Sequence, residues 1–245
     1  MNSFCVILGS VGEKMRMYEG VKTWNPIVGC NFLCLYCDPS FQKQMRRQKQ
    51  RCFDCYTYTP HFHPERLNKL PNAKTIFTCA FSDIACAEEE WIEKVLDVVR
   101  NNQSRIFYIQ TKDPAIFDKF DFPNNVLKGV TIETDLDRFE TPSLFVDYTD
   151  LSRAPTPSKR IKALSYVDYI TIEPILDFSQ DFASVIREIK PKFVYIGYDN
   201  HNTNLPEPEL QKTRNLLDEL GKFVEVRVKT LRRAWYELVL CSLRE

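Results

Sequence analysis

Glycine is scarce in this chain, at only seven of 245 residues. Flexible glycine-rich linkers are therefore not expected, and the sequence shows neither internal repeats nor low-complexity tracts. No apolar run approaches the roughly 20 residues that span a bilayer, so we expect no membrane partner. The first residues carry no basic stretch before their short apolar run, which makes a poor signal peptide. We therefore expect a cytoplasmic protein.

An excess of charge of either sign is also missing. Lys and Arg together number 33, and Asp and Glu also number 33. This balance gives no global reason to expect nucleic acid as a partner, although a local basic patch is compatible with it. One basic stretch does occur within residues 42–51. It is either a solvated helix face or a set of phosphate contacts, so nucleic acid is one candidate partner.

Cysteine, by contrast, is abundant, with nine residues. An odd number argues against a complete set of disulfides, and a reducing compartment keeps thiols available for metals or for catalysis. We therefore expect the clustered cysteines to be ligands.

Short β-rich runs alternate with helical periodicity along most of the chain. The β-rich runs are mostly continuous in apolar or β-branched residues, as in parallel strands buried on both faces. Strand–helix alternation indicates right-handed βαβ units. The expected strands are Val21–Ile27, Thr75–Phe81, Arg105–Thr111, Leu127–Glu133, Tyr166–Ile172, Lys192–Gly197 and Phe223–Val228, and the later helices are Asp181–Lys190, Glu207–Leu220 and Leu231–Arg244.

This pattern predicts an α/β protein in which residues 1–245 form a single domain, a partial (β/α)6 TIM-like barrel. Its one long interruption is the segment Asp38–Leu70, inserted after the first strand and containing cysteine and histidine. An insertion of this length in a compact domain is usually functional or separately braced. The helix Leu231–Arg244 is expected to close the barrel at the carboxyl terminus.

The clearest motif follows the first expected strand. Cys30, Cys34 and Cys37 have the spacing C-x3-C-x2-C. Thiolates hold iron–sulfur clusters, and short spacings allow one loop to wrap three irons of a cubane cluster. The fourth iron would be open to a chelating small molecule, much as a catalytic metal site keeps a free position. The alternative is a non-catalytic module in which the cysteines hold zinc.

This spacing, with Tyr36 as the aromatic residue before the last cysteine, resembles the signature of the radical S-adenosylmethionine (SAM) superfamily. Further short motifs follow the order seen in an uncharacterised family of phage, bacterial and archaeal proteins. That family is similar to radical SAM proteins and has some similarity to spore photoproduct lyase. The motifs lie between about residues 20 and 200 and are Thr23-Trp24-Asn25-Pro26, His63-Pro64-Glu65-Arg66-Leu67, Ser82-Asp83, Gln110-Thr111-Lys112 and Ile172-Glu173-Pro174.

The resemblance implies a barrel of the radical SAM type with a 4Fe–4S cluster on the three cysteines. It further implies reductive cleavage of SAM to methionine and a 5′-deoxyadenosyl radical, which would act on an unidentified substrate. A small electron-donor protein, such as a ferredoxin or flavodoxin, would be a partner. The similarity to the lyase leaves DNA or RNA as an alternative substrate for modification or repair.

Polar residues at the ends of the expected strands are the candidates for cofactor and substrate contacts, because chemistry in β/α barrels sits at that edge. By the resemblance, Ser82 and Asp83 fall where radical SAM enzymes hold the SAM amino group, and Glu133 where they contact the ribose. Tyr36 belongs to the same expected cofactor site. Substrate contacts are expected from Lys112, Glu173 and Asp199, and no catalytic acid or base is assigned.

A second cysteine pair lies inside the insertion. Cys52 and Cys55, followed by His61 and His63, supply four candidate ligands within twelve residues. A C-x2-C knuckle with two imidazoles fits tetrahedral Zn2+, although His-x-His is tighter than in ordinary zinc fingers. A second iron–sulfur cluster or a redox pair are the alternatives. We predict that the pair braces the insertion through a metal or a disulfide, because this segment is too polar to form a core of its own.

Overall fold

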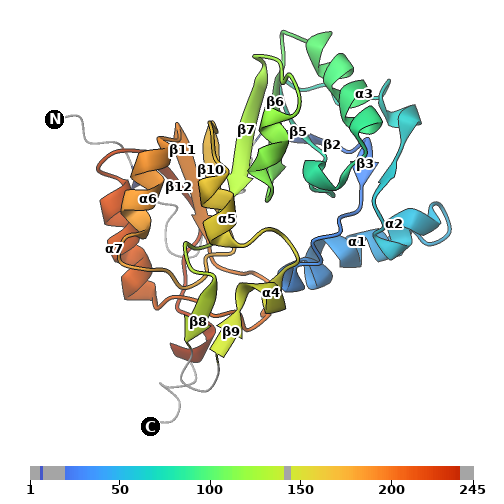
Figure 1. The fold of residues 1–245 in the computed structure, drawn as a ribbon. Helices are drawn as coiled ribbons and strands as arrows, with labels where there is room; N and C mark the ends of the chain where they lie inside the picture. Colours follow the sequence, from blue (N-terminus) through green and yellow to red (C-terminus); the bar gives the residue numbers. More distant parts are fainter. Residues whose placement is uncertain (1–5, 8–19, 141–144, 238–245) are drawn as a thin grey trace. The chain divides into compact units, whose positions relative to one another are not determined.

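The structure is a computed structural model that describes residues 6–7, 20–140 and 145–237 (Figure 1). Its contacts divide the chain into two compact units. The cysteine unit comprises Gly20–Val130 and Leu151–Pro155, and the C-terminal unit contains the described parts of Thr131–Asp150 and Thr156–Glu245 together with β1 (Val6–Ile7). That residues 1–245 form a single domain stays a prediction.

Four parallel strands form the sheet of the cysteine unit. β2 (Lys22–Trp24) pairs with β5 (Thr75–Thr78), which pairs with β6 (Ile106–Thr111). β6 in turn pairs with β7 (Val126–Thr131). The strands are rich in β-branched and aromatic residues that pack well on a pleated surface. Their carboxyl ends share one edge of the sheet, and residues 29–37 are hydrogen-bonded to the residues that follow β5 at that edge.

Helix α3 (Glu89–Arg100) connects β5 to β6. Its apolar residues recur at helical spacing, and Ile92, Val95, Leu96 and Val99 are all fully buried. Each such side chain contributes roughly 1.5–3 kcal/mol when it leaves water. This stripe therefore fixes the helix beside its sheet.

The expected first strand, Val21–Ile27, is two strands in the structure. β2 ends at Trp24, and β3 (Ile27–Val28) turns away to pair antiparallel with β4 (His61–Phe62). Between β3 and β4 the chain forms only short helical pieces, and all except the first lie within the predicted insertion. These are η1 (Leu35–Cys37), η2 (Asp38–Gln42), α1 (Lys43–Met45), η3 (Arg46–Gln48) and α2 (Phe53–Thr57), and β4 is followed by η4 (Pro64–Arg66).

The C-terminal unit has its own parallel strands. β10 (Tyr169–Ile172) pairs with β11 (Phe193–Gly197), which pairs with β12 (Glu225–Thr230), and β1 pairs with β12. Helices α6 (Phe182–Ile189) and α7 (Leu210–Leu220) provide the connections and lie side by side (Figure 1). The preceding elements are the antiparallel pair β8 (Arg138–Glu140) and β9 (Phe145–Asp147), then α4 (Tyr148–Leu151) and α5 (Pro157–Lys162).

The predicted partial (β/α)6 barrel is wrong. A barrel of that kind requires a regular succession of strand–helix repeats, but β6 is followed only by the short 3-10 turn η6 (Pro114–Asp118), and β7 by the β8–β9 hairpin. The strands are parallel and several are joined by helices, as in α/β proteins, yet they belong to two compact units. Continuous apolar strands look alike in any parallel sheet, so the sequence pattern could not distinguish these arrangements.

The predicted C-terminal helix is also largely absent from the described residues. Residues 231–234 are not helical, residues 235–237 are, and the remainder of Leu231–Arg244 lies outside the described part of the chain. Within residues 6–7, 20–140 and 145–237, no helix has the length and apolar character needed to cross a bilayer.

Candidate metal centre and cysteine loop

Four side chains of the insertion bring their ligand atoms together. The sulfurs of Cys52 and Cys55 and one ring nitrogen each of His61 and His63 all lie within 4.8 Å of one another. Cys55 Sγ is 3.3 Å from the Nε2 atom of each histidine, and the two Nε2 atoms are 2.8 Å apart. We call these four residues the Cys2His2 centre. It is a group that could hold a metal ion, and among the described residues it is where such ligands converge.

The cysteine half of the centre is formed by the start of α2. Cys52 is the N-cap residue, with extended backbone dihedrals, and its sulfur accepts a hydrogen bond from the backbone NH of Cys55. A residue at this position normally satisfies one of the unpaired NH groups of the first helical turn. The helix therefore holds both sulfurs on one side. It ends at Tyr58, whose left-handed conformation turns the chain back toward β4.

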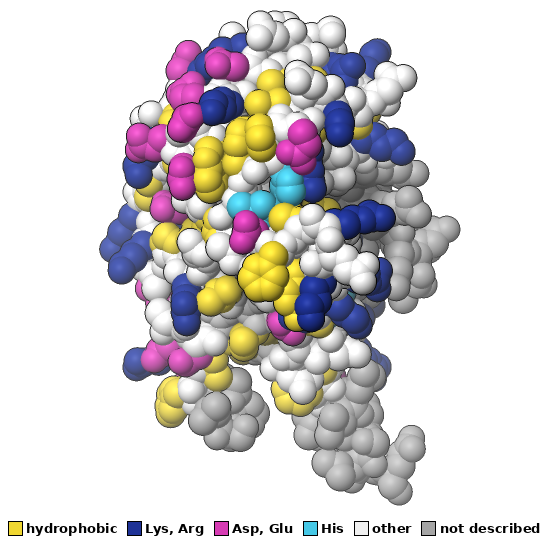
Figure 2. Space-filling model, turned by 90° about the vertical axis from the view of Figure 1, so that its right-hand side faces the viewer, with side chains coloured by type: hydrophobic (Ala, Val, Ile, Leu, Met, Phe, Trp, Pro, Cys, Tyr) yellow, Lys and Arg dark blue, Asp and Glu magenta, His cyan; other side chains and the backbone are white. Residues whose placement is uncertain are grey.

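The histidine half depends on the strand geometry of β4. Successive side chains of a strand point to opposite faces, so His61 and His63 share a face while Phe62 points away. Phe62 stacks on Trp91 of α3 at a centroid distance of 6.0 Å. The His-x-His spacing is tighter than in a zinc finger, but in an extended chain it places both imidazoles on the same face. Histidine side chains also reach the molecular surface (Figure 2).

A hydrogen bond to the Nδ1 atom orients each imidazole. His61 Nδ1 donates to the carbonyl oxygen of Thr59 at 2.8 Å, and His63 Nδ1 donates to the carboxylate of Glu65 at 3.1 Å. With Nδ1 protonated, Nε2 carries the lone pair that binds a metal. Backbone carbonyls and carboxylates are the usual outer partners of metal-bound histidines. The predicted convergence of Cys52, Cys55 and a histidine is thus confirmed, and both histidines take part.

The pKa shifts of two ligands, His63 and Cys55, bear on how the centre would bind a metal. Burial, with the nearby charge of Arg66, lowers the pKa of His63, which favours the neutral imidazole that binds metals. Burial raises the pKa of the Cys55 thiol to about 11, with a further contribution from Cys52. In the absence of an ion the Cys55 thiol is protonated at neutral pH. Metal binding would therefore displace a proton from this sulfur.

The cysteine loop, residues 29–37, begins where β3 ends. Gly29 has φ +94°, and its backbone NH donates to Phe81 O at 2.9 Å. The Ser82 hydroxyl donates to Gly29 O at 2.6 Å. These bonds attach the loop to the residues that follow β5. The backbone NH of Cys30 also donates to Tyr58 O at 3.3 Å, which ties the loop to the end of α2.

Two of the three cysteines of the loop have different neighbours. Cys30 Sγ is 3.7 Å from Cys86 Sγ, and Cys34 Sγ is 3.1 Å from the Ser152 hydroxyl. Contact with Cys86, burial and the Asp83 carboxylate raise the pKa of Cys30 well above its usual value. Burial, followed by the thiolates of Cys30, Cys37 and Cys34, raises the pKa of Tyr58.

Asp83, an expected SAM contact, holds the local backbone in this structure. Its carboxylate accepts from Ala85 N at 3.0 Å, from the Thr111 hydroxyl at 2.6 Å and from Lys112 N at 2.7 Å. Burial raises its pKa to about 6 even though these donors act in the opposite direction. Asp83 therefore joins the carboxyl ends of β5 and β6 beside the cysteine loop. A direct contact with SAM stays a prediction for Asp83 and Ser82.

Lys112 faces the cysteine motif. It is only 8% exposed, its ammonium donates to the Tyr36 hydroxyl, and it lies 4.6 Å from the centre of the Tyr36 ring. Tyr36 is itself 8% exposed. The buried cation and the aromatic residue of the motif are therefore held against each other at the same edge of the sheet.

The remaining predicted site residues lie in the C-terminal unit. Glu133 is fully buried and accepts hydrogen bonds from Tyr148 OH at 3.0 Å and from Arg160 at 2.6 Å. A paired, fully buried carboxylate of this kind organises the interior of its unit. Glu173 accepts from Lys229, and Asp199 accepts from the backbone NH of His201 and Thr203. Their roles toward cofactor or substrate stay predictions.

With this geometry established, the chain can be compared with known protein families. The model of a family described as "Protein of unknown function (DUF5131)" matches residues 20–178. The chain belongs to this family. No curated protein matches the chain.

The DUF5131 match includes every element of the two cysteine-bearing sites. The cysteine loop, the Cys2His2 centre, Ser82, Asp83 and Glu133 all lie within residues 20–178, whereas β11 and β12 lie beyond them. The family model therefore covers both cysteine-bearing sites of this DUF5131 chain, whereas Asp199 lies beyond it. Its description assigns no activity to these residues.

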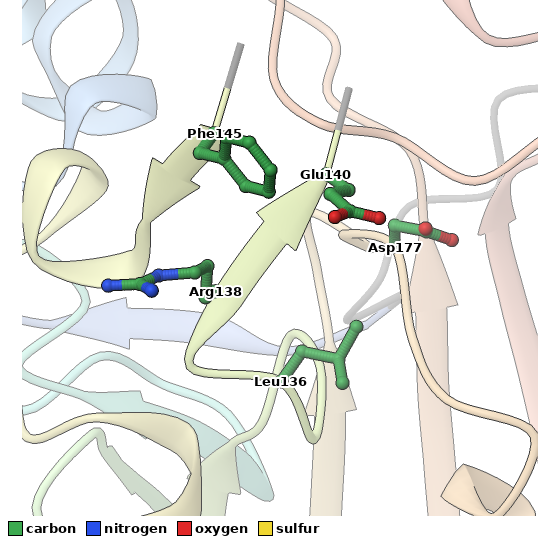
Figure 3. A pocket seen from close by; sticks show the side chains of 5 residues that line it. All are labelled: Leu136, Arg138, Glu140, Phe145 and Asp177. Atoms are coloured by element: carbon green, nitrogen blue, oxygen red, sulfur yellow. The ribbon is translucent and has the colours of Figure 1, made fainter. Parts of the chain in front are cut away.

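A shallow pocket in the C-terminal unit is unrelated to these sites. It measures about 360 Å³ and is lined by residues of the β8–β9 hairpin and of two loops, one before β8 and one after β10 (Figure 3). Arg138 is paired with Asp147 at 2.6 Å rather than directed at a ligand. The lining residues are Leu136, Arg138, Glu140, Phe145 and Asp177, and none was a predicted site residue.

Two contributors to the cysteine loop were not expected from the sequence. Cys86 lies against Cys30, and its sulfur also accepts from Asn31 N at 3.4 Å. Tyr58 contributes the backbone acceptor for Cys30 and the buried phenol. Neither residue belongs to a spaced motif. The only signal in the sequence is proximity, because Cys86 comes three residues after Asp83 and Tyr58 comes three residues after Cys55.

Proposed function

We propose that this DUF5131 protein is a radical SAM enzyme whose 4Fe–4S cluster is held by Cys30, Cys34 and Cys37. The observation that carries the proposal is the attachment of the cysteine loop to the carboxyl end of a parallel strand, through the Ser82–Gly29 hydrogen bond. Strand carboxyl ends are where α/β proteins bind ligands. The cluster spacing and the aromatic Tyr36 add chemical support.

The residues of the loop suit a group larger than one ion. Among the described residues, the ligand atoms that converge on one point are those of the Cys2His2 centre and not the three thiols of the loop. When bound there, a cluster with three thiolate ligands would offer its remaining iron to SAM and supply the electron for its cleavage. An external donor, such as a ferredoxin or flavodoxin, would have to provide that electron.

The chain's own residues would position the cofactor. Asp83 holds Lys112 N and the Thr111 hydroxyl, which fixes the loop after β6. The Lys112 ammonium, held near the Tyr36 ring, supplies a buried positive charge beside the motif. Such a charge favours a carboxylate, whereas the Asp83 carboxylate favours an ammonium group. Both groups occur in an amino acid such as the methionine part of SAM.

The Cys2His2 centre would hold a structural Zn2+ ion. With Zn–S of ~2.3 Å and Zn–N of ~2.0 Å, tetrahedral coordination places ligand atoms about 3.3–3.8 Å apart. Three sulfur–nitrogen distances in the centre are 3.4, 3.3 and 3.3 Å. Four protein ligands leave no open position, which is typical of structural rather than catalytic zinc. Thiolate ligands of both sites persist in a reducing compartment, which supports a cytoplasmic location.

Anaerobic reconstitution with iron and sulfide tests the enzyme proposal against a zinc-only module. We expect about four irons per chain, a brown colour with a broad band near ~400 nm, and one zinc. The Cys30→Ala, Cys34→Ala, Cys37→Ala variant should lose the iron and retain the zinc, because the Cys2His2 centre is intact. A variant that keeps all of its iron would refute the assignment, and a wild-type chain that takes up only zinc would favour the non-catalytic module.

A further inference from the structure

The insertion carries an uncompensated positive charge. Residues 41–51 contain five Lys and Arg residues and no acidic residue, in a chain whose net charge is zero. Arg46 is paired with Asp38 at 2.9 Å. The other four cations are exposed, and within the described part of the chain none forms an ion pair with a carboxylate. They are Lys43, Arg47, Lys49 and Arg51.

A solvated helix face would normally mix charges of both signs, as α3 does. Glu90 pairs with Lys94, and Asp97 pairs with Arg100 on that helix. Residues 41–51 contain no acidic residue to compensate their Lys and Arg side chains, so these positive charges repel one another. Retaining four unpaired cations in a short segment is expected where an external anion neutralises them.

Exposed aromatic rings accompany the cations. Phe53 is 66% exposed, and its ring lies 6.0 Å from that of Tyr56. The Lys49 ammonium is 5.2 Å from the centre of the Tyr56 ring. Phe41, at the other end of the segment, is 40% exposed. Cations interleaved with exposed rings are the combination that binds single-stranded nucleic acids, through phosphate contacts and base stacking.

The Cys2His2 centre holds this surface in place. Arg51 precedes Cys52 directly, and Phe53 and Tyr56 belong to α2, whose Cys52 and Cys55 supply two of the metal ligands. Ordering the segment before binding lowers the entropy cost of binding. Lys and Arg side chains gather to the lower right of the histidines in Figure 2. The surface is also connected to the cysteine loop through the Cys30 N–Tyr58 O hydrogen bond.

We infer that residues 41–56 form a binding surface for single-stranded nucleic acid, and that a nucleic acid is the substrate class of the proposed enzyme. The second part rests on the proposed function, whereas binding itself does not. A duplex is a poorer fit, because α1 has three residues and α2 five, too short to fill a major groove. Stacking on Phe53 also requires bases that are not already paired and stacked.

Fluorescence anisotropy of the zinc-loaded full chain, without SAM, tests this inference with three fluorescein-labelled 15-mers: single-stranded DNA, single-stranded RNA and duplex DNA. We expect at least one single strand to bind tighter than the duplex. With about four phosphates neutralised, log K should fall with log[KCl] with a slope of about −3. No binding at 50 mM KCl, or tighter binding of the duplex, would overturn the inference.

Two variants separate this surface from a general charge effect. Lys43→Glu, Arg47→Glu, Lys49→Glu should weaken binding at least tenfold and flatten the salt slope. The matched control reverses three exposed lysines outside the segment, Lys119, Lys159 and Lys162, and should stay within threefold of wild type. Zinc content and circular dichroism should be the same in both variants. Equal losses in the two would overturn the inference.

Phe53→Ala tests the stacking component. We expect about tenfold weaker binding of the single strand with an unchanged salt slope, because the ring contributes through stacking and not through charge. Single-strand binding as tight as that of wild type would overturn the assignment to single strands. A chain that binds but cleaves no SAM would preserve the binding surface and refute the proposed function, so the two failures are distinguishable.

Discussion

The two cysteine-bearing sites of the cysteine unit differ in how far their ligand atoms converge. In the Cys2His2 centre four ligand atoms lie within 4.8 Å, and each histidine has an outer hydrogen-bond partner. In the cysteine loop Cys30 lies against Cys86, whereas Cys34 lies against Ser152. One small ion can join only atoms that converge. The comparison therefore supports a single ion at the first site, whereas a cluster on the cysteine loop stays a proposal.

The largest effect should follow removal of the sulfurs of the Cys2His2 centre. Cys52→Ser, Cys55→Ser should abolish binding of the zinc ion proposed for this centre and expose residues 38–63 to protease, because α1, η3 and α2 are too short to be stable alone. Elemental analysis and limited proteolysis provide the measurements. The cysteine-loop triple variant is the control and should retain its zinc. If the double variant kept its zinc and its protease resistance, the Cys2His2 centre would not be the site that binds the ion and braces the insertion.

A substitution at Gly29 acts where the two sites meet. A Cβ atom there would overlap the carbonyl of Thr59 and lie 2.6 Å from Pro60 N, and the residue has φ +94°. Gly29→Ala should therefore lower the free energy of unfolding by roughly 3 kcal/mol or more. Gly20→Ala is the matched control, because Gly20 has φ +74° but nothing within 4 Å of a Cβ, so only about 1 kcal/mol is expected. Equal losses in urea denaturation would mean that the close approach of Gly29 to Thr59 has no cost.

The buried carboxyl of Asp83 should make the stability of the folded chain depend on pH. Its folded-state pKa of about 6 exceeds the ordinary value of about 3.9, so between those pH values the folded chain keeps a proton that the unfolded chain has lost. This carboxyl therefore lowers stability as the pH rises through that window. From pH 5 to pH 7, zinc-loaded wild type should lose roughly 1 kcal/mol more than Asp83→Asn.

Denaturant titrations of the two zinc-loaded chains at both pH values measure this difference. Because zinc is present in both chains, any change in the Cys2His2 centre cancels in the comparison. If the stability of wild type and of Asp83→Asn changed equally with pH, Asp83 would not hold a proton in the folded chain as described.

The smallest expected effect concerns the outer partner of His63. Removing the charge with Glu65→Gln should weaken zinc binding about tenfold, because the carboxylate orients the imidazole and increases its basicity. Competition with a chromophoric chelator measures the affinity. Glu90→Gln, which alters an exposed carboxylate paired with Lys94, is the control and should leave the affinity unchanged. Identical affinities in the two variants would show that the Glu65 contact does not support the centre.

Local features were predictable from the sequence where the cause was local. β6, β10 and β11 lie within the expected runs, because buried parallel strands are continuously apolar. The Cys2His2 centre was predictable because its four ligands lie within twelve residues. The arrangement of strands was not, since apolar runs do not encode which strands pair or whether they close. The Cys30–Cys86 contact was not either, because it depends on how the end of β5 meets the loop after β3.

The central claim is that the cysteine loop carries a cluster that cleaves SAM while the Cys2His2 centre only supports it. The most direct test is to reconstitute the zinc-containing chain anaerobically, add dithionite and SAM, and quantify methionine and 5′-deoxyadenosine by mass spectrometry. We predict that both products form in equal amounts and that they disappear in the Cys30→Ala, Cys34→Ala, Cys37→Ala variant. A chain with full iron and zinc content that releases neither product would contradict the account.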